Sequence, residues 1–105
     1  MTKRKTSADL DLGEPVFEAI APVLRVLGHP DRLRIVSLLS GGQVTVAEVA
    51  DTLRLAPNAV SQHLNIMRAH GIVRGVREGR KMYYHVVHPA AASLLQCMRR
   101  NAGRV

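Results

Sequence analysis

The sequence predicts a mainly α-helical domain with one small β-hairpin, an α+β fold in which four helices precede the hairpin and one follows it. Apolar residues recur at three- and four-residue intervals over most of the chain. The segment 72–87 is rich in valine and tyrosine and has a glycine near its centre, as a hairpin does. The length of 105 residues suits a single domain with a modest core.

Composition separates a short arm from the folded region. Residues 1–13 are polar and charged and have no hydrophobic period, so we expect a disordered basic arm there. Residues 14–102 are expected to form the folded domain. No apolar run approaches the length of a membrane span, and no hydrophobic segment follows the basic N-terminus as in a secretory signal. Cys97 is the single cysteine, which excludes an intramolecular disulfide and favours a cytoplasmic location.

Proline and glycine divide the first two helices. The first is expected to begin near Pro15 and to kink or break at Pro22, because proline removes a backbone hydrogen bond. The second is expected to begin at Pro30, with His29 as a candidate cap, and to end at two consecutive glycines.

A helix-turn-helix is predicted next. Thr45 and Glu48 have the spacing of a capping box, which marks the start of the third helix. A short turn over residues 54–56 leads into a fourth helix, expected over about residues 57–70. Two short helices joined by a tight turn form the helix-turn-helix motif.

The two sides of the fourth helix differ in chemistry. One side is apolar, and the other carries amides, a hydroxyl and an arginine but no carboxylate. A solvated helix usually mixes acids with bases, whereas an acid-free polar face can contact base edges and phosphates in a DNA major groove. A plain surface helix is the alternative. The polar residues are Asn58, Ser61, Gln62, Asn65 and Arg68.

The predicted hairpin, residues 73–87, is basic. Cations near the tip of the hairpin cannot contribute to a hydrophobic core. A hairpin beside a helix-turn-helix is called a wing, and its arginines can lie over a DNA minor groove or the phosphate backbone. The predicted architecture is therefore a winged helix-turn-helix. The basic residues of the hairpin are Arg74, Arg77, Arg80 and Lys81.

The charge distribution also favours nucleic acid as the partner. The chain has 15 Lys and Arg against 8 Asp and Glu, a formal charge of +7. Between residues 54 and 81 there are six of these cations and one acid, Glu78. A concentrated basic segment is typical of nucleic-acid binders, although basic charge can also serve solubility alone. Aromatic residues are few, which disfavours recognition of RNA or single strands by stacking.

The last helix, beginning at His88 and Pro89, has an apolar side for which we expect nothing left to cover within one small domain. Pairing with a second copy would bury that side and supply the two-fold symmetry of a major-groove reader. We therefore expect a homodimer, formed through the N-terminal and C-terminal helices, on double-stranded operator DNA. The apolar residues of this helix are Ala91, Leu94, Leu95 and Met98.

Three motifs resemble those of the ArsR/SmtB family of bacterial winged-helix repressors. Residues 27–35, LGHPDRLRI, resemble the family's opening motif; residues 59–64, AVSQHL, its recognition helix; and residues 79–84, GRKMYY, its wing. The match covers roughly residues 15–100. The resemblance implies a homodimer, a helix-turn-helix that reads an operator, and repression relieved by an inducer, often a metal ion.

The sequence departs from the family's metal sensors at their ligand positions. Residues 44–48, at the start of the third helix, contain no cysteine, and the dithiol sensors need two cysteines where this chain has one. The glycine usual in the inter-helix turn is Arg54 here. The positions that carry ligands on the family's last helix correspond to His88, Ala90, Asn101 and Arg104.

Sensing residues are therefore only candidates. His85 and His88, with their copies in a dimer, could hold a transition-metal ion, but no carboxylate follows Glu78 to complete the shell. His63 is expected to be packed and hydrogen-bonded. Cys97 could be oxidised or form an intersubunit disulfide; a buried structural thiol is the favoured alternative. No cofactor is predicted, and a repressor that has no small-molecule sensor and is regulated by its own amount is an open alternative.

The leading interpretation is a dimeric, sequence-specific transcriptional repressor. A non-specific architectural DNA-binding protein and a protein-interaction module that uses the last helix are the alternatives. An enzyme is not expected, because the sequence has no phosphate-binding glycine loop and its acids other than Glu78 are scattered over residues 9–51.

Overall fold

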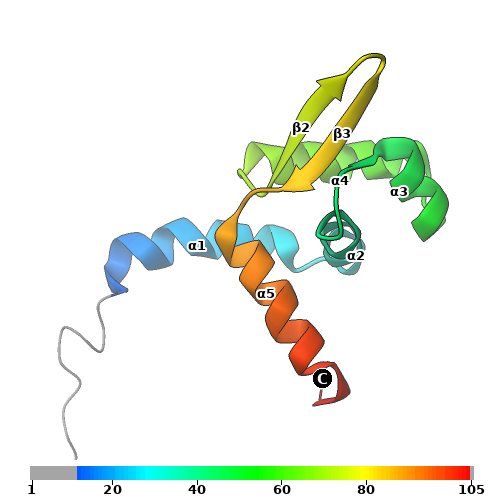
Figure 1. The fold of residues 1–105 in the computed structure, drawn as a ribbon. Helices are drawn as coiled ribbons and strands as arrows, with labels where there is room; N and C mark the ends of the chain where they lie inside the picture. Colours follow the sequence, from blue (N-terminus) through cyan, green and yellow to red (C-terminus); the bar gives the residue numbers. More distant parts are fainter. Residues whose placement is uncertain (1–11, 105) are drawn as a thin grey trace, which may run out of the picture.

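The computed structural model describes residues 12–104, which form five α-helices, three β-strands and a short 3-10 helix (Figure 1). The predicted fold class is confirmed. The expected basic arm lies outside the described residues except at its end, where α1 already begins. The helices are α1 Gly13–Leu27, α2 Pro30–Leu39, α3 Val46–Leu53, α4 Pro57–Ala69 and α5 Pro89–Arg100, followed by η1 Ala102–Arg104; the strands are β1 Val44–Thr45, β2 Val73–Glu78 and β3 Lys81–Val86.

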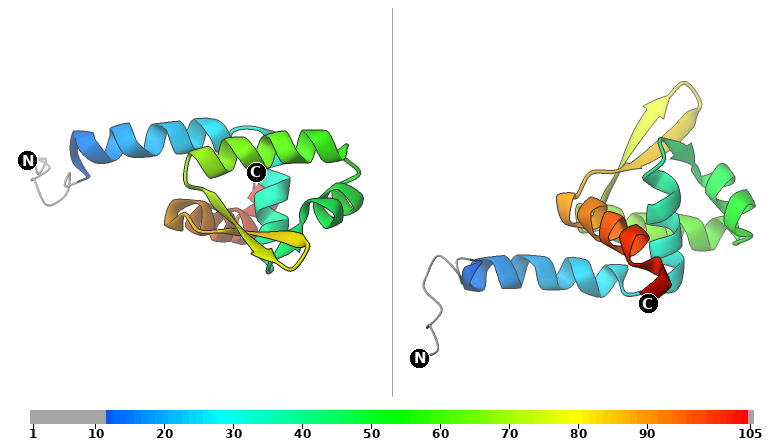
Figure 2. Two further views of the ribbon diagram at one scale, coloured as in Figure 1. Left: turned by 90° about the horizontal axis from the view of Figure 1, so that it is seen from above. Right: turned by 60° about the horizontal axis from the view of Figure 1, so that its bottom comes forward.

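Of the kink or break expected at Pro22, the break is wrong, because α1 is one continuous helix with Pro22 inside it. Figure 2 shows α1 as a single rod that extends from the rest of the domain. A proline inside a helix costs about 3 kcal/mol. Val23, Val26 and Leu27, directly after it, are buried in the core. Burying such side chains contributes about 1.5–3 kcal/mol each, which outweighs that cost.

The hairpin is part of a three-stranded antiparallel sheet with the order β1-β3-β2. Strands β2 and β3 pair from Val73 opposite Val86 to Glu78 opposite Lys81, which leaves a two-residue loop. Its first residue, Gly79, has a φ of 63°, and glycine with positive φ at that position is a feature of type II′ hairpin turns. The short strand β1, which was not predicted, pairs with the middle of β3 and so ties the hairpin to the start of α3.

The predicted capping box at the start of α3 is confirmed. The Thr45 hydroxyl accepts a hydrogen bond from the Glu48 backbone N–H at 3.2 Å, and the Glu48 carboxylate accepts one from the Thr45 N–H at 2.9 Å. Because these bonds favour the ionised acid, they lower the pKa of Glu48 below its ordinary value of 4.5.

A Schellman motif ends α4 and directs the chain into β2. The Ile72 N–H donates to the Met67 carbonyl at 2.9 Å, and the Gly71 N–H donates to the Arg68 carbonyl at 3.0 Å. Gly71 has a φ of 70°, which this motif requires of the residue after the helix. Met67 and Ile72, which the motif brings together, are both fully buried. The hairpin is thus joined to α4 by a fixed turn.

The core takes side chains from every long helix and from the start of β2. On α5, Ala91 and Leu95 are buried in this core, and Leu94 and Met98 pack partly against it. The expectation that the apolar side of the last helix has nothing to cover within the domain is therefore wrong. None of the helices within residues 12–104 is long and apolar enough to cross a membrane.

Candidate nucleic-acid interface

The apolar side of α4 fixes how this helix is turned. Val60, Leu64 and Met67, at positions i, i+4 and i+7, have no solvent exposure. Their burial turns the opposite side outward. On that side Asn58, Gln62, Asn65 and Arg68 are exposed and Ser61 is half-buried.

The cations of the hairpin are also exposed. In Figure 1 strands β2 and β3 project beyond the layer formed by α3 and α4. None of the hairpin's basic side chains forms an ion pair with another residue of the segment 12–104. Their positive charge is therefore available to a partner. These side chains belong to Arg74, Arg77, Arg80 and Lys81.

Arg54 ends α3 and occupies the turn of the helix-turn-helix. Its φ of 57° and ψ of 45° place it in the left-handed region, where glycine is favoured. It is the only residue other than glycine with a positive φ in the described part of the chain. The turn therefore keeps its shape with an exposed cation in place of glycine.

Two arginines of α2 differ from these cations, because both are bonded within the protein. Arg34 forms an ion pair with Asp31 at 2.6 Å, one helical turn away. Arg32 donates from Nη1 to the carbonyl of Val26 at 3.2 Å, and from Nε to Nδ1 of His63 at 3.1 Å. Neither side chain is simply solvated.

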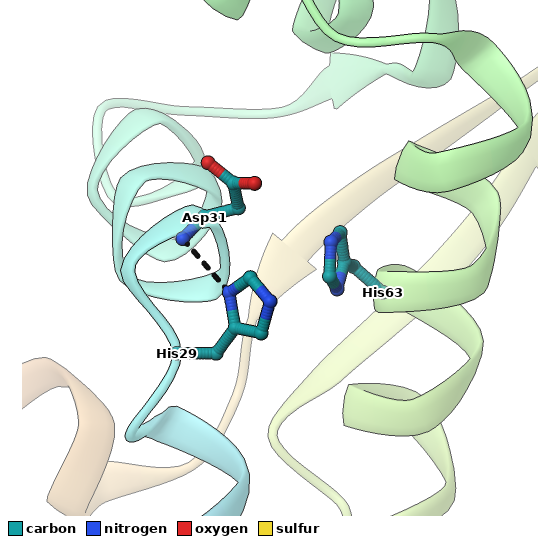
Figure 3. Close-up of side chains that lie close together, drawn as sticks. All are labelled: His29, Asp31 and His63. Atoms are coloured by element: carbon teal, nitrogen blue, oxygen red, sulfur yellow. Dashed lines mark hydrogen bonds between the residues drawn. The ribbon is translucent and has the colours of Figure 1, made fainter.

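Two histidines meet between the start of α2 and the middle of α4. The Nδ1 atom of His29 accepts a hydrogen bond from the Asp31 backbone N–H at 3.1 Å, which confirms His29 as the cap of α2. Its ring lies beside that of His63 on α4, with centroids 4.7 Å apart (Figure 3). The prediction of a packed, hydrogen-bonded His63 is also confirmed. Burial, then the neighbouring His29 and Arg32, lower the pKa of His63 below its ordinary value of 6.5.

Among the described residues, His29, Asp31 and His63 form the one group that could hold a metal ion, with one ligand atom of each within 4.8 Å of the others. Their hydrogen bonds do not suit that use. Both imidazoles accept at Nδ1, so in the neutral rings the proton is on Nε2, and neither Nε2 has a free lone pair. The guanidinium of Arg32 also adds positive charge beside the group. As arranged, the two rings are neutral hydrogen-bond acceptors, and the group does not suit a metal ion.

The candidate metal residues His85 and His88 are not joined by a third ligand within residues 12–104. His88 instead caps α5, because its Nδ1 accepts a hydrogen bond from the Ala90 N–H at 3.1 Å. The Nδ1 atom of His85 is buried and has no hydrogen-bond partner in this segment. One protomer therefore does not complete a metal shell there.

The expectation of a buried structural thiol at Cys97 is wrong for the protomer, where Cys97 is exposed. The side of α5 that enters the core is the one with Ala91 and Leu95, and Cys97 lies on a different side of the helix. Asn101 donates to the Cys97 carbonyl at 2.8 Å.

The bond between Arg32 and His63 could not be found from the sequence. Each residue lies in a motif noted there, but 31 positions separate them. No helical or strand period links residues so far apart, so only folding brings them together.

Comparisons with known proteins agree with this architecture. Residues 27–76 match a family described as a helix-turn-helix domain. The Biofilm growth-associated repressor of Agrobacterium fabrum is 30% identical over 93% of this chain and 90% of its own length. The HTH-type transcriptional repressor SmtB of Mycobacterium tuberculosis is 39% identical over 68% of this chain and 53% of its own length. The structure of the transcriptional repressor BigR from Xylella fastidiosa superposes with a TM-score of 0.73 at 27% identity, covering 90% of this chain and 91% of that one.

Proposed function

This chain belongs to the ArsR/SmtB family of helix-turn-helix transcriptional regulators, and we propose that it is a homodimeric repressor of a specific double-stranded operator. The family is one of transcriptional regulators and not of enzymes, in agreement with the interpretation of the sequence. Binding of DNA to regulate transcription follows from the family. The dimer, the operator contacts and a cytoplasmic location are our proposals.

In the proposed complex α4 lies in the major groove. The amides of Asn58, Gln62 and Asn65 can donate to and accept from base edges, and Arg68 can neutralise a phosphate. Ser61, which is half-buried, can approach the same surface. Because this side of α4 carries no carboxylate, the DNA phosphates meet no negatively charged side chain there.

The hairpin is proposed to follow the backbone or enter the minor groove. Arg77, Arg80 and Lys81 lie toward its tip, and Arg74 lies near its base. Cations that already had protein partners would lose those bonds on meeting DNA, whereas these have no ion pair within the described segment. They can therefore neutralise phosphates without that loss.

The proposed dimer uses α1 together with α5. Large apolar side chains of α1, among them Val16, Phe17 and Leu24, are about half exposed in the protomer. Several large exposed apolar side chains on one helix are typical of a protein–protein interface. A two-fold dimer would present two copies of α4 to two half-sites.

The observation that carries the proposal is that α4 buries one side and exposes an acid-free polar side, next to a hairpin whose basic side chains form no ion pair within residues 12–104. The test is the affinity of the purified protein for its own upstream DNA and for random DNA of equal length, over a salt series. Preference for the upstream DNA supports a specific repressor. Equal affinity would favour an architectural DNA-binding protein, and no binding near physiological salt would favour a protein-interaction module.

A metal ion or oxidant as the inducer is tested on the preformed complex. Zn²⁺, Ni²⁺, Co²⁺, Cu⁺, arsenite and an oxidant are added in turn while DNA release is followed. Release by a metal that His85→Ala and His88→Ala abolish would assign those residues to sensing. Release by an oxidant that Cys97→Ser abolishes would assign the exposed thiol.

A further inference from the structure

Arg32 joins three helices through two hydrogen bonds. From the first turn of α2 it donates to the Val26 carbonyl of α1 and to the His63 ring of α4. Within residues 12–104, the bond to His63 is the only side-chain hydrogen bond that links α4 to another helix. The polar contact between the proposed recognition helix and the rest of the domain therefore depends on one imidazole.

Both bonded imidazoles must be neutral. Nδ1 of His63 faces the Nε–H donor of Arg32, and Nδ1 of His29 faces the N–H donor of Asp31. A proton added at either Nδ1 turns the acceptor into a second donor, so that two N–H groups point at each other. Figure 3 shows that His29 lies between the Asp31 nitrogen and the His63 ring, so a charge on either ring also acts on the other.

We propose that His29, His63 and Arg32 form a proton-sensitive contact that positions α4, so that protonation of the two rings weakens operator binding. The inference rests on the proposed function, because it concerns the affinity of α4 for DNA. At neutral pH the contact is closed, and acidification opens it.

The charges around the pair support this direction. His63 faces His29 and Arg32, which disfavour its protonation, and Asp31, which favours it. The Asp31 carboxylate is already paired with Arg34 at 2.6 Å, so it compensates a new charge only in part. The pKa of His63 is lower in the folded protein than its ordinary 6.5, so the closed contact is fully stable above 6.5. The stabilisation that this contact contributes is lost as the pH falls from 6.5 through the lowered pKa of His63.

The predicted sign is opposite to the general effect of histidine on DNA binding. In general, protonation of exposed histidines adds positive charge and strengthens binding to phosphates. A weakening that depends on His29 and His63 therefore identifies the proposed contact.

The test compares the wild type with the double variant His29→Asn/His63→Asn. The amide oxygen of asparagine replaces Nδ1 as an acceptor but does not titrate, and asparagine is a good N-cap for α2. Operator dissociation constants are measured at pH of about 7.5 and about 5.5, at fixed ionic strength with a chelator. From pH 7.5 to 5.5 we expect the wild type to lose about tenfold in affinity relative to the double variant, the effect of one or two lost hydrogen bonds.

His70→Asn is the matched control. His70 lies at the end of the same helix and is exposed, and among the described residues its side chain bonds only to the carbonyl of Ile66. This variant should retain the wild-type loss of affinity. An equal pH dependence in the wild type and the double variant would overturn the proposal, as would global unfolding of the wild type at the lower pH, seen by circular dichroism.

A measurement on the free protein separates this inference from the proposed function. In NMR titrations, the signal of the Arg32 Nε–H should shift together with that of the His63 ring, and the signal of the Asp31 amide together with that of the His29 ring. If they do not, the contact is not proton-sensitive and the inference is wrong, whether or not DNA binds. Absence of operator binding at both pH values would instead overturn the proposed function.

Discussion

Helices α1 and α4 bury one apolar side each, but their exposed sides are opposite in character. On α1 the exposed residues include Val16 and Phe17, the latter 50% exposed. On α4 they are amides and an arginine, such as Gln62 and Arg68. An apolar surface is best covered by another protein, and an acid-free polar surface by nucleic acid. The comparison supports the proposal that α1 contributes to the dimer and that α4 reads the operator.

The division also runs along α1 itself. Its C-terminal half supplies Val23, Val26 and Leu27 to the core, whereas its N-terminal half extends away from the domain (Figure 2). The apolar side of α1 thus contributes to the core at one end and to the proposed dimer interface at the other. A substitution in the N-terminal half should therefore change dimer formation without unfolding the protomer.

The largest effect is expected from Phe17→Lys. A lysine in the proposed interface should convert the dimer into a monomer, and loss of the second half-site should weaken operator binding about 100-fold or more. Sedimentation equilibrium and operator titration measure the two changes. Glu18→Lys, the adjacent residue on the polar side of α1, should leave the dimer intact. If the Phe17→Lys protein is still a dimer, the proposal that α1 forms the dimer interface is wrong.

Gln62→Ala is expected to change operator binding by α4 and to leave the dimer unaffected. Loss of one base contact should weaken operator binding by about tenfold, within the range of about 1–3 kcal/mol for such contacts, and leave random DNA unaffected. Competition titrations with the two DNAs measure the ratio, and the dimer should be unchanged. If discrimination is retained, Gln62 does not read the operator.

Arg80→Ala should weaken both kinds of DNA binding together. Removal of one phosphate contact at the tip of the hairpin is expected to reduce affinity a few-fold and lower the slope of log affinity against log salt by about 1. The measurement is a salt series on operator and random DNA. Arg34→Ala is the matched control, because Arg34 is paired with Asp31 within α2; an equal effect of the two variants would contradict the assignment.

Thr45→Ala tests the support of α4 by α3. Removing the capping hydroxyl should lower the free energy of unfolding by about 1 kcal/mol, measured in urea, without changing the dimer contacts of α1. The pKa of Glu48 is lowered in the folded state, so its ionised form stabilises the fold above pH 4.5 and that contribution is lost as the pH falls below it. The difference between the variant and the wild type should therefore shrink on acidification; a constant difference would contradict the capping box.

The smallest effect is expected from Arg54→Gly. Glycine relieves the left-handed strain of the turn but adds entropy to the unfolded chain, so the fold should gain roughly 0.5–1 kcal/mol. Thermal unfolding measures the gain. Because the exposed cation is lost, affinity for both DNAs should decrease slightly; an unchanged affinity would show that Arg54 does not face DNA.

The sequence predicted those parts of the fold that depend on neighbouring residues. The capping box of Thr45 and Glu48 spans one helical turn, and the apolar positions of α4 recur within two turns. The hairpin was predicted because a segment rich in valine and tyrosine has a glycine at its reversal. Each of these features is set by local backbone geometry, which residue types reveal directly.

The expectations that were wrong concern packing over longer distances. Pro22 does not break α1, because the core holds the residues that follow it. Cys97 is exposed, because the core receives Ala91 and Leu95 of the same helix. The period of a helix shows that it has an apolar side, but the surfaces available in the folded domain decide which residues of that side are covered.

By itself the sequence determined the order of the elements, the two-sided chemistry of α4 and the basic hairpin, because each follows from residue types at short spacings. Only the tertiary structure decided that Arg32 bonds to His63 and that His29 lies against the same ring. These contacts join the first turn of α2 to the middle of α4, and their formation depends on how the helices dock. Docking is set by the burial of the whole core, to which residues throughout the chain contribute.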